Sequence, residues 1–146
     1  MKKVKVLPTR TVPQGIAAML SFHADGDFDE VVAAMERRIT EVETGDITTA
    51  VRSVEIDGVA VKEGQIIGLH NGKMVSAGES PDAVMIDLLG KMNAPDRELL
   101  TLYYGNGLTS GTVEKTANVV KEHYDHLEIE IHQGGQQHYH YIFSLE

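Results

Sequence analysis

The sequence predicts an α/β domain in which a mixed sheet with flanking helices contains an inserted antiparallel β meander. Residues 27–42 place their apolar side chains at helical spacing, which indicates an amphipathic helix. Two turn dipeptides, Asp57-Gly58 and Asn71-Gly72, stand between short β-type runs and indicate two hairpins. A nearly continuous apolar run over residues 98–104 is typical of a strand that is covered on both faces.

The amino-terminal part of the chain is predicted to form one strand and two helices. Residues 4–7 form an apolar run that stops before a proline, and this pattern favours a strand. Pro13 then stands where the first turn of a helix tolerates a residue without an N–H group. The helix over residues 27–42 starts with Asp27 and Glu30 at the spacing of a capping box.

The middle of the chain is predicted to form the antiparallel meander. Beyond Gly45 the apolar pattern changes from helical spacing to β-type runs that are interrupted by the two turn dipeptides. The predicted strands cover residues 47–56, 59–61, 65–70 and 73–77.

The carboxyl-terminal half is predicted to alternate helices with strands. Ser80 and Pro81 suit the N-cap and the first position of a helix that ends near Asn93. The strand over residues 98–104 precedes a helix that Thr109 caps. Two alternating segments, residues 127–132 and 138–145, then complete the sheet, and a loop rich in glutamine and glycine joins them.

The composition predicts one compact domain and excludes several functional classes. The chain has 146 residues, 42% of them hydrophobic, and no cysteine, which excludes disulfides, cysteine-type zinc sites and thiol nucleophiles. The formal net charge of -9 makes nucleic acid a poor candidate partner. No window approaches the roughly 20 apolar residues that a membrane span needs, and no signal peptide is recognisable. We therefore expect a soluble cytoplasmic domain.

The turn that enters the first helix is a candidate binding site. Hydroxyls, a guanidinium group and backbone N–H groups gather there around one helix N-terminus, where an anion or a partner backbone could bind. The alternative is that the threonines only cap the helix while the arginine lies in solvent. The candidate residues are Thr9, Arg10, Thr11, Gln14 and Gly15.

A second candidate is the loop after the buried strand, with Tyr103, Tyr104 and Gly105. If that strand runs parallel to the predicted strand over residues 4–7, this loop and the first turn open at the same sheet edge, where wound α/β folds bind ligands. The alternative is a glycine loop that only reverses the chain. Two consecutive tyrosines cannot both face one core, so we expect one of them to be exposed.

Neither a metal centre nor a catalytic centre is favoured. His132, His138 and His140 lie close together in the sequence and would suit zinc, but their alternation is better explained by solvent-facing positions on a hairpin. No Gly-x-Ser-x-Gly motif occurs, and the acidic residues near the predicted helix starts have the ordinary role of charges at an N-terminus. We expect no catalytic residue and no metal in this domain.

Two long segments carry a resemblance to a known family. Residues 6–20, which contain the turn into the first helix, and residues 44–52 resemble the C-terminal domain of dihydroxyacetone-kinase-like proteins, the A subunit of bacterial fatty acid kinase. Shorter motifs follow in the same order as in that family, and the match spans essentially the whole chain. These motifs include the tyrosine loop named above and the tetrapeptide Gln133, Gly134, Gly135 and Gln136. The layout also resembles the second half of DegV-type proteins.

The resemblance implies a role in a larger kinase. Residues 1–146 would form a single C-terminal domain of a kinase polypeptide whose N-terminal domain binds ATP and magnesium and is followed by a middle domain. The C-terminal domain is implied in docking the acyl-carrying DegV-type B subunit, whose fatty acid is phosphorylated. We therefore expect a non-catalytic interaction domain that uses both candidate loops and residues 133–137 as its contact surface.

Two departures from the family qualify this expectation. The acidic metal ligands of the kinase domain are absent from this sequence, which removes catalysis from the domain. Gln137 and His140 stand where the family usually has prolines, so the histidine-rich ending is interpreted as local variation. The alternative function is a small-molecule domain that binds phosphate or an acyl phosphate in the same crevice and contributes to kinase turnover. The formal net charge of -9 weighs against it.

Overall fold

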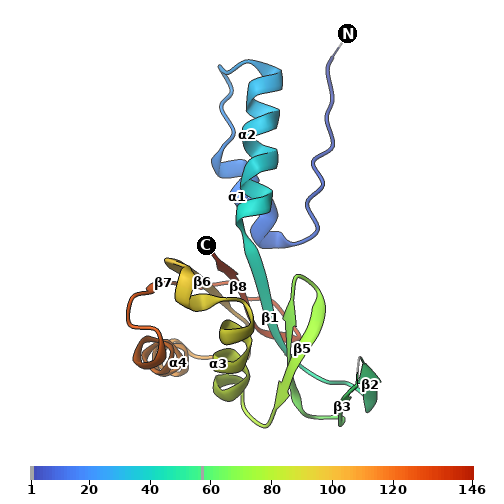
Figure 1. Cartoon of the computed structure of the whole chain (residues 1–146), viewed down its shortest axis with the longest axis vertical. Helices are drawn as coiled ribbons and strands as arrows, with labels where there is room; N and C mark the ends of the chain where they lie inside the picture. The colour runs from blue at the N-terminus through green and yellow to red at the C-terminus, as the bar shows by residue number, and fades with distance from the viewer. Residues whose placement is uncertain (1, 57) are drawn as a thin grey trace. The chain divides into compact units, whose positions relative to one another are not determined.

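The computed structural model describes residues 2–56 and 58–146, which form two compact units (Figure 1). The first unit is Met1–Val42 and the second is Glu43–Glu146. Within the described part of the chain, every helix is too short or too polar to cross a bilayer.

The first unit contains a pair of helices, α1 (Val12–Leu20) and α2 (Phe28–Glu41). The Asp27 carboxylate accepts a hydrogen bond from the Glu30 N–H, so α2 begins where its capping residues predict. Ala18 of α1 packs against Met35 and Ile39 of α2, and these three side chains form the small core of this unit. Both predicted helices are therefore confirmed.

The predicted strand over residues 4–7 is wrong. These residues are not part of any β ladder with the described residues. Val4 and Val6 are 85% and 83% exposed. Residues 3–6 do alternate between polar and apolar side chains. A β-strand, however, needs a second strand to share its backbone hydrogen bonds, and no described strand pairs with this segment.

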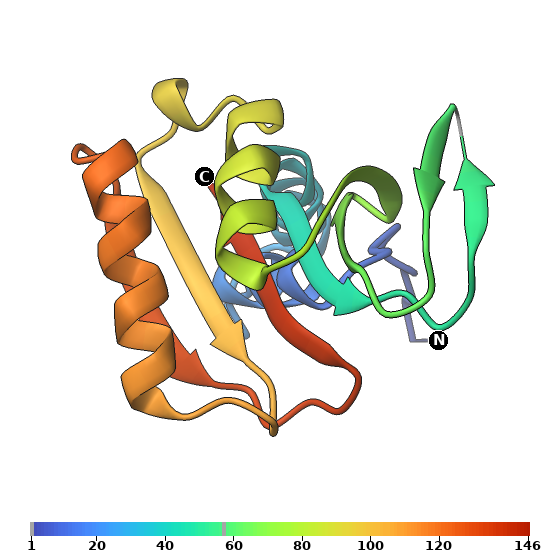
Figure 2. The ribbon, with the colours of Figure 1, turned by 90° about the horizontal axis from the view of Figure 1, so that it is seen from below.

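The second unit is built on a six-stranded mixed sheet with the strand order β5-β4-β1-β8-β6-β7 (Figure 2). The edge strand β7 runs parallel to β6, and the other neighbouring strands are antiparallel. This arrangement confirms the predicted mixed sheet. The strands are β1 (Glu43–Thr49), β4 (Ile66–His70), β5 (Lys73–Gly78), β6 (Leu99–Tyr104), β7 (Glu128–Gln133) and β8 (Tyr139–Leu145).

Helices α3 (Pro81–Lys91) and α4 (Ser110–His123) pack on the sheet and enclose the main core. Helix α4 connects the parallel strands β6 and β7, as a parallel pair requires, and a short 3-10 helix, Ala94–Asp96, precedes β6. The hydroxyl groups of Ser80 and Thr109 cap the two helices as predicted. The core residues alternate along the strands and recur on the helices; they include Leu88, Leu89, Leu100, Leu102, Val113, Val120 and Phe143.

The meander is confirmed in outline, with one correction. The predicted strand over residues 47–56 divides into β1, which ends at Thr49, and β2 (Val54–Ile56), because the chain turns away after Ala50. Strand β2 pairs with β3 (Val59–Val61) in a separate two-stranded sheet, and Val61 packs with Ala50 and Met74. Asp57, half of the first predicted turn, lies outside the described residues.

The second predicted hairpin is β4 and β5, which pair antiparallel around the Asn71-Gly72 turn. Both turn residues have positive φ, 49° for Asn71 and 85° for Gly72, which is the backbone that a two-residue hairpin turn requires. This hairpin is confirmed.

Candidate functional site

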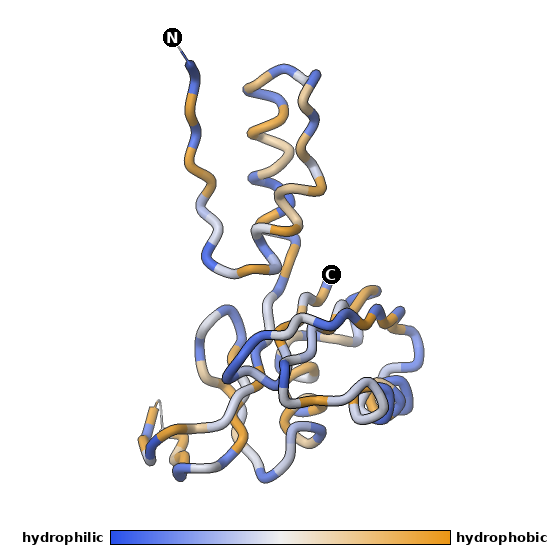
Figure 3. Tube along the Cα trace, turned by 180° about the vertical axis from the view of Figure 1, so that it is seen from behind, coloured by the Kyte–Doolittle hydropathy of each residue, from blue (hydrophilic) through white to orange (hydrophobic). Residues whose placement is uncertain are grey.

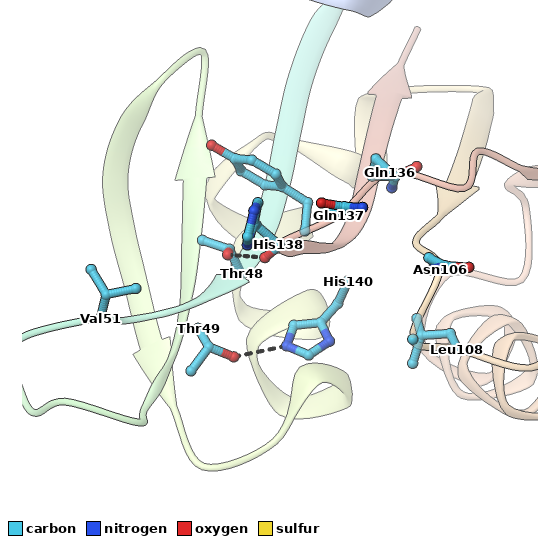
Figure 4. Close-up of a pocket in the computed structure, with 11 residues that line it drawn as sticks. Thr48, Thr49, Val51, Asn106, Leu108, Gln136, Gln137, His138 and His140 are labelled. Atoms are coloured by element: carbon cyan, nitrogen blue, oxygen red, sulfur yellow. Dashed lines mark hydrogen bonds between the residues drawn. The ribbon is translucent and has the colours of Figure 1, made fainter.

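A pocket of about 590 Å³ opens beside the carboxyl end of β6 (Figure 4). It lies entirely within the second unit, between the end of β1, the loop that leads into α4, and the segment that enters β8. The pocket is lined by Thr48, Thr49, Val51, Asn106, Gly107, Leu108, Gln136, Gln137, His138, Tyr139 and His140.

Gly105 allows the loop after β6 and the segment that enters β8 to lie close together. Its N–H group donates to the His140 carbonyl at 2.9 Å, and the next N–H, of Asn106, donates to the Gln136 carbonyl at 2.9 Å. A Cβ atom on Gly105 would collide with the carbonyl oxygen of Tyr139. A glycine is therefore needed at this point for the loop after β6 to lie against the start of β8.

The loop between β7 and β8 is tied to the end of β6 by three hydrogen bonds. The N–H groups of Gly134 and Gly135 both donate to the Tyr104 carbonyl, at 2.9 and 3.1 Å. The Gln136 side-chain amide donates to the Tyr103 carbonyl at 2.8 Å. Gly135 has a φ of +71°, a conformation that favours glycine. The structure thus brings the predicted residues from 103–105 and 133–136 together, with the Gln136 side chain holding the loop in place.

The expectation of one exposed tyrosine is wrong, because Tyr103 and Tyr104 are both half-buried. Tyr103 stacks on the ring of His132, its register partner on β7, with ring centroids 5.5 Å apart. Burial raises the pKa of Tyr103 above its usual value, and the charges of Glu130 and Glu146 add to this effect. Tyr104 packs against the main core.

Two threonines at the end of β1 complete the pocket, and no pattern in the sequence indicated their role. The Thr48 hydroxyl donates to the His138 carbonyl at 2.5 Å, and the Thr49 hydroxyl lies 2.9 Å from Nε2 of His140 (Figure 4). Burial lowers the pKa of His140, which favours the neutral imidazole at neutral pH. The pairing joins residues about 90 positions apart, so only the three-dimensional register of β1 and β8 reveals it.

The pocket is lined mainly by hydrogen-bonding side chains. Its polar lining consists of hydroxyls, amides and imidazoles, and none of the described residues that line it is a lysine, an arginine or a carboxylate. Among the described residues, no group of three or more histidine, cysteine or acidic side chains is arranged to hold a metal ion. These groups suit hydrogen bonds to backbone or neutral polar groups better than the capture of a phosphate, which cations favour.

The first candidate turn lies in the first unit and is organised as a helix cap. The Thr11 hydroxyl accepts from the Gln14 N–H at 3.3 Å, and the Gln14 side-chain oxygen accepts from the Arg10 N–H at 2.7 Å. The Gly15 N–H donates to the Thr11 carbonyl at 3.1 Å, as in an ordinary helical turn, and Thr9 is exposed. The backbone N–H groups of Arg10, Gln14 and Gly15 are therefore engaged within the chain, which favours the capping role.

The shared sheet edge that we predicted for the two candidate loops rested on a strand over residues 4–7. That strand does not form, so this argument for joining the two loops is wrong. A common contact surface of residues 9–15 with the pocket loops stays a prediction.

Comparisons with known proteins place the chain in a family. The family model for the C-terminal region of proteins like the fatty acid kinase A subunit matches residues 1–146. Uncharacterized proteins of Staphylococcus aureus strains USA300 and NCTC 8325 are each 36% identical to the chain over 141 residues. These matches cover 97% of this chain and 26% of each relative, so the chain spans about a quarter of the length of these curated relatives. The chain belongs to this family of C-terminal domains of fatty acid kinase A-like proteins, which confirms the resemblance.

The fold is similar to that of a DegV-family protein. The crystal structure of a DegV-family protein from Ruminococcus gnavus with vaccenic acid matches 92% of this chain and 55% of its own chain, with a TM-score of 0.55. The sequence identity is 13%, so this likeness concerns the fold alone. The predicted fold class, including its likeness to DegV-type proteins, is confirmed.

Proposed function

We propose that this chain is a non-catalytic docking domain of the A subunit of a fatty acid kinase. In this role it binds the acyl-carrying DegV-type B subunit, and it presents the acyl carboxylate to a kinase domain elsewhere in the enzyme. ATP and magnesium belong to that kinase domain. The family match supports the kinase context. In this proposal the fatty acid is carried by the partner rather than by this chain.

The observation that carries the proposal is the assembled loop surface around the pocket. Residues 106–108 and 136–140 come from separate parts of the chain, and backbone hydrogen bonds hold them in one fixed arrangement. Asn106 and Gln137 are exposed beside the pocket, where their amides can hydrogen-bond to a partner. A polar surface whose loops already hydrogen-bond to one another can bind another protein without ordering a loop first, which reduces the entropic cost of association.

The proposal predicts that the chain competes with the complete enzyme. We expect an excess of the chain to lower ATP-dependent acyl phosphate formation by a two-subunit fatty acid kinase of this family, because the chain occupies the B subunit. Added B subunit should restore the rate. The reaction is followed by ADP release.

Matched variants locate the surface in the same assay. The double variant Asn106→Lys, Gln137→Lys should lose at least about tenfold in inhibitory potency, equivalent to about 1.4 kcal/mol of binding free energy. The control Asn118→Lys makes the same chemical change at an exposed position on α4 and should inhibit like the unmodified chain. Full kinase activity in the presence of a large excess of chain would refute the docking role.

A further inference from the structure

Residues 3–7 have the side-chain pattern of a strand with one face in contact with the helix pair. Lys3 lies over the Phe28 ring, with Nζ 5.6 Å from the ring centroid, and Nζ of Lys5 lies 3.4 Å from Oε1 of Glu36. Leu7 packs against the small core of α1 and α2. The alternate residues Val4 and Val6 point away from these contacts and are 85% and 83% exposed. The period of two and the apolar outer face are those of a strand between two layers.

The backbone of residues 3–6 is open for pairing, whereas the Leu7 carbonyl accepts from the Thr9 N–H at 2.9 Å. Among the described residues, no backbone hydrogen bond joins residues 3–6 to another segment, and no β ladder includes them. An extended segment with open N–H and C=O groups is a template for strand addition. The valines also favour β structure, which is why the sequence predicts a strand here.

The exposed apolar residues of the molecule are concentrated in the same unit. Of the twelve described residues that are large, hydrophobic and exposed, eight lie within the first 42 positions. Figure 3 shows hydrophobic positions recurring along the N-terminal segment and the helix pair. Such a concentration of exposed apolar residues is unusual for a surface that faces only solvent and is typical of an interaction site. The eight residues are Val4, Val6, Val12, Ile16, Met19, Leu20, Phe22 and Phe28.

The connection to α1 indicates what kind of sheet this strand fits. Only residues 8–11 separate the segment from α1, and α1 and α2 cover the face that bears Leu7. A strand, a short turn and a helix packed back on the strand form half of a β-α-β unit, whose second strand is parallel to the first. The covering helices are present, whereas the neighbouring parallel strand is absent from the described part of the chain.

We propose that residues 3–7 add as a strand to a parallel β-sheet of the polypeptide that the longer relatives carry outside the matched region. The match covers only 26% of those relatives, so they contain ample chain for such a sheet. Val4 and Val6 enter the second apolar layer of that sheet, and their backbone groups complete its ladder. This inference rests on the proposed role within a larger kinase polypeptide, but it concerns a surface separate from the pocket loops that we assign to the B subunit.

The test mixes the full chain with the purified part of the S. aureus USA300 relative that lies outside the matched region. We expect a one-to-one complex by light scattering after size-exclusion chromatography. Hydrogen exchange of the amides of residues 3–7 should slow by roughly tenfold or more in the complex. The double variant Val4→Lys, Val6→Lys should abolish the complex, because it places charge in an apolar layer.

The control variant is Ile56→Lys in the second unit, where the isoleucine is 40% exposed and lies outside the lining of the pocket. It should bind normally, and circular dichroism checks that both variants are folded. Absence of a complex overturns the inference, as does a complex that the Val4 and Val6 changes leave intact. Slowed hydrogen exchange of residues 3–7 in a dimer of the chain alone would also overturn the inference, because the segment would then pair with a second copy of the chain. Binding of the DegV-type protein, measured separately, tests the proposed function independently.

Discussion

Two glycines of the second unit lie so close to neighbouring segments that there is no room for a side chain. Gly105 lies against the backbone of the segment that enters β8, and Gly45 of β1 lies directly beneath the ring of Phe143, its register partner on β8. Neither glycine has a positive φ, so each is required by space rather than by backbone conformation. The Phe143 ring is fully buried in the main core.

We predict that Gly45→Ala lowers the free energy of unfolding by about 1–3 kcal/mol, because the new methyl group would overlap the Phe143 ring. The control Gly107→Ala adds the same group where nothing lies within 4 Å, and its effect should stay within about 0.5 kcal/mol. Urea unfolding of both variants provides the measurement. Equal stability of the two would contradict the close contact.

At the scale of elements, local signals identified the helices and the second hairpin correctly. Capping residues such as Asp27 and Thr109 act within a few positions, so their effect is readable from the sequence. Residues 4–7 carry an equally clear strand pattern, yet a strand depends on a partner that local sequence does not contain. The break after Thr49 was missed for a related reason, since the pairing of β1 with β4 and β8 determines where β1 ends.

The candidate site was predictable in part. Glycines and tyrosines after a buried strand indicated the loop at residues 103–105, and the glutamine-glycine run indicated residues 133–136. The contributions of Thr48, Thr49 and the imidazole of His140 depend on the register between strands that are far apart in the sequence, so no local pattern reveals them.

Strand β1 also carries a carboxyl group in an unfavourable position. Asp46 is half-buried, and its register partners on the two neighbouring strands, Leu69 and Ile142, are apolar. Burial raises the pKa of Asp46 from 3.8 to about 6. The folded state therefore binds this proton more tightly than the unfolded state does, and the contribution of Asp46 to stability falls as the pH rises from about 4 through 6.

We predict that Asp46→Asn raises the free energy of unfolding at pH 7 by about 1–2 kcal/mol, a value reduced for the partial exposure of the side chain. The gain over the unmodified chain should shrink towards zero near pH 4, where the carboxyl group is protonated in the folded state and half-protonated in the unfolded state. Denaturant unfolding at several pH values measures the difference. Asp125→Asn, at an exposed position, serves as the control. A gain that is independent of pH would contradict the raised pKa.

At the scale of the whole molecule, the two units offer two different kinds of surface. The second unit has a complete core and a rigid polar pocket, which suit reversible docking of a partner. The first unit has a small core and a concentration of exposed apolar residues, which suit permanent packing. The proposed docking role would need both properties, because the contact with the acyl carrier must exchange with each cycle while the contact with the rest of the polypeptide must persist.

Equilibrium binding tests the docking role most directly. The chain is titrated into the purified DegV-type B subunit loaded with a fatty acid, in the presence of ATP and magnesium, and heat is recorded by calorimetry while ADP is assayed in the same samples. We predict saturable one-to-one binding that the Asn106→Lys, Gln137→Lys variant weakens, without release of ADP. Absence of binding, or ATP turnover by the chain with only the B subunit present, would contradict the account.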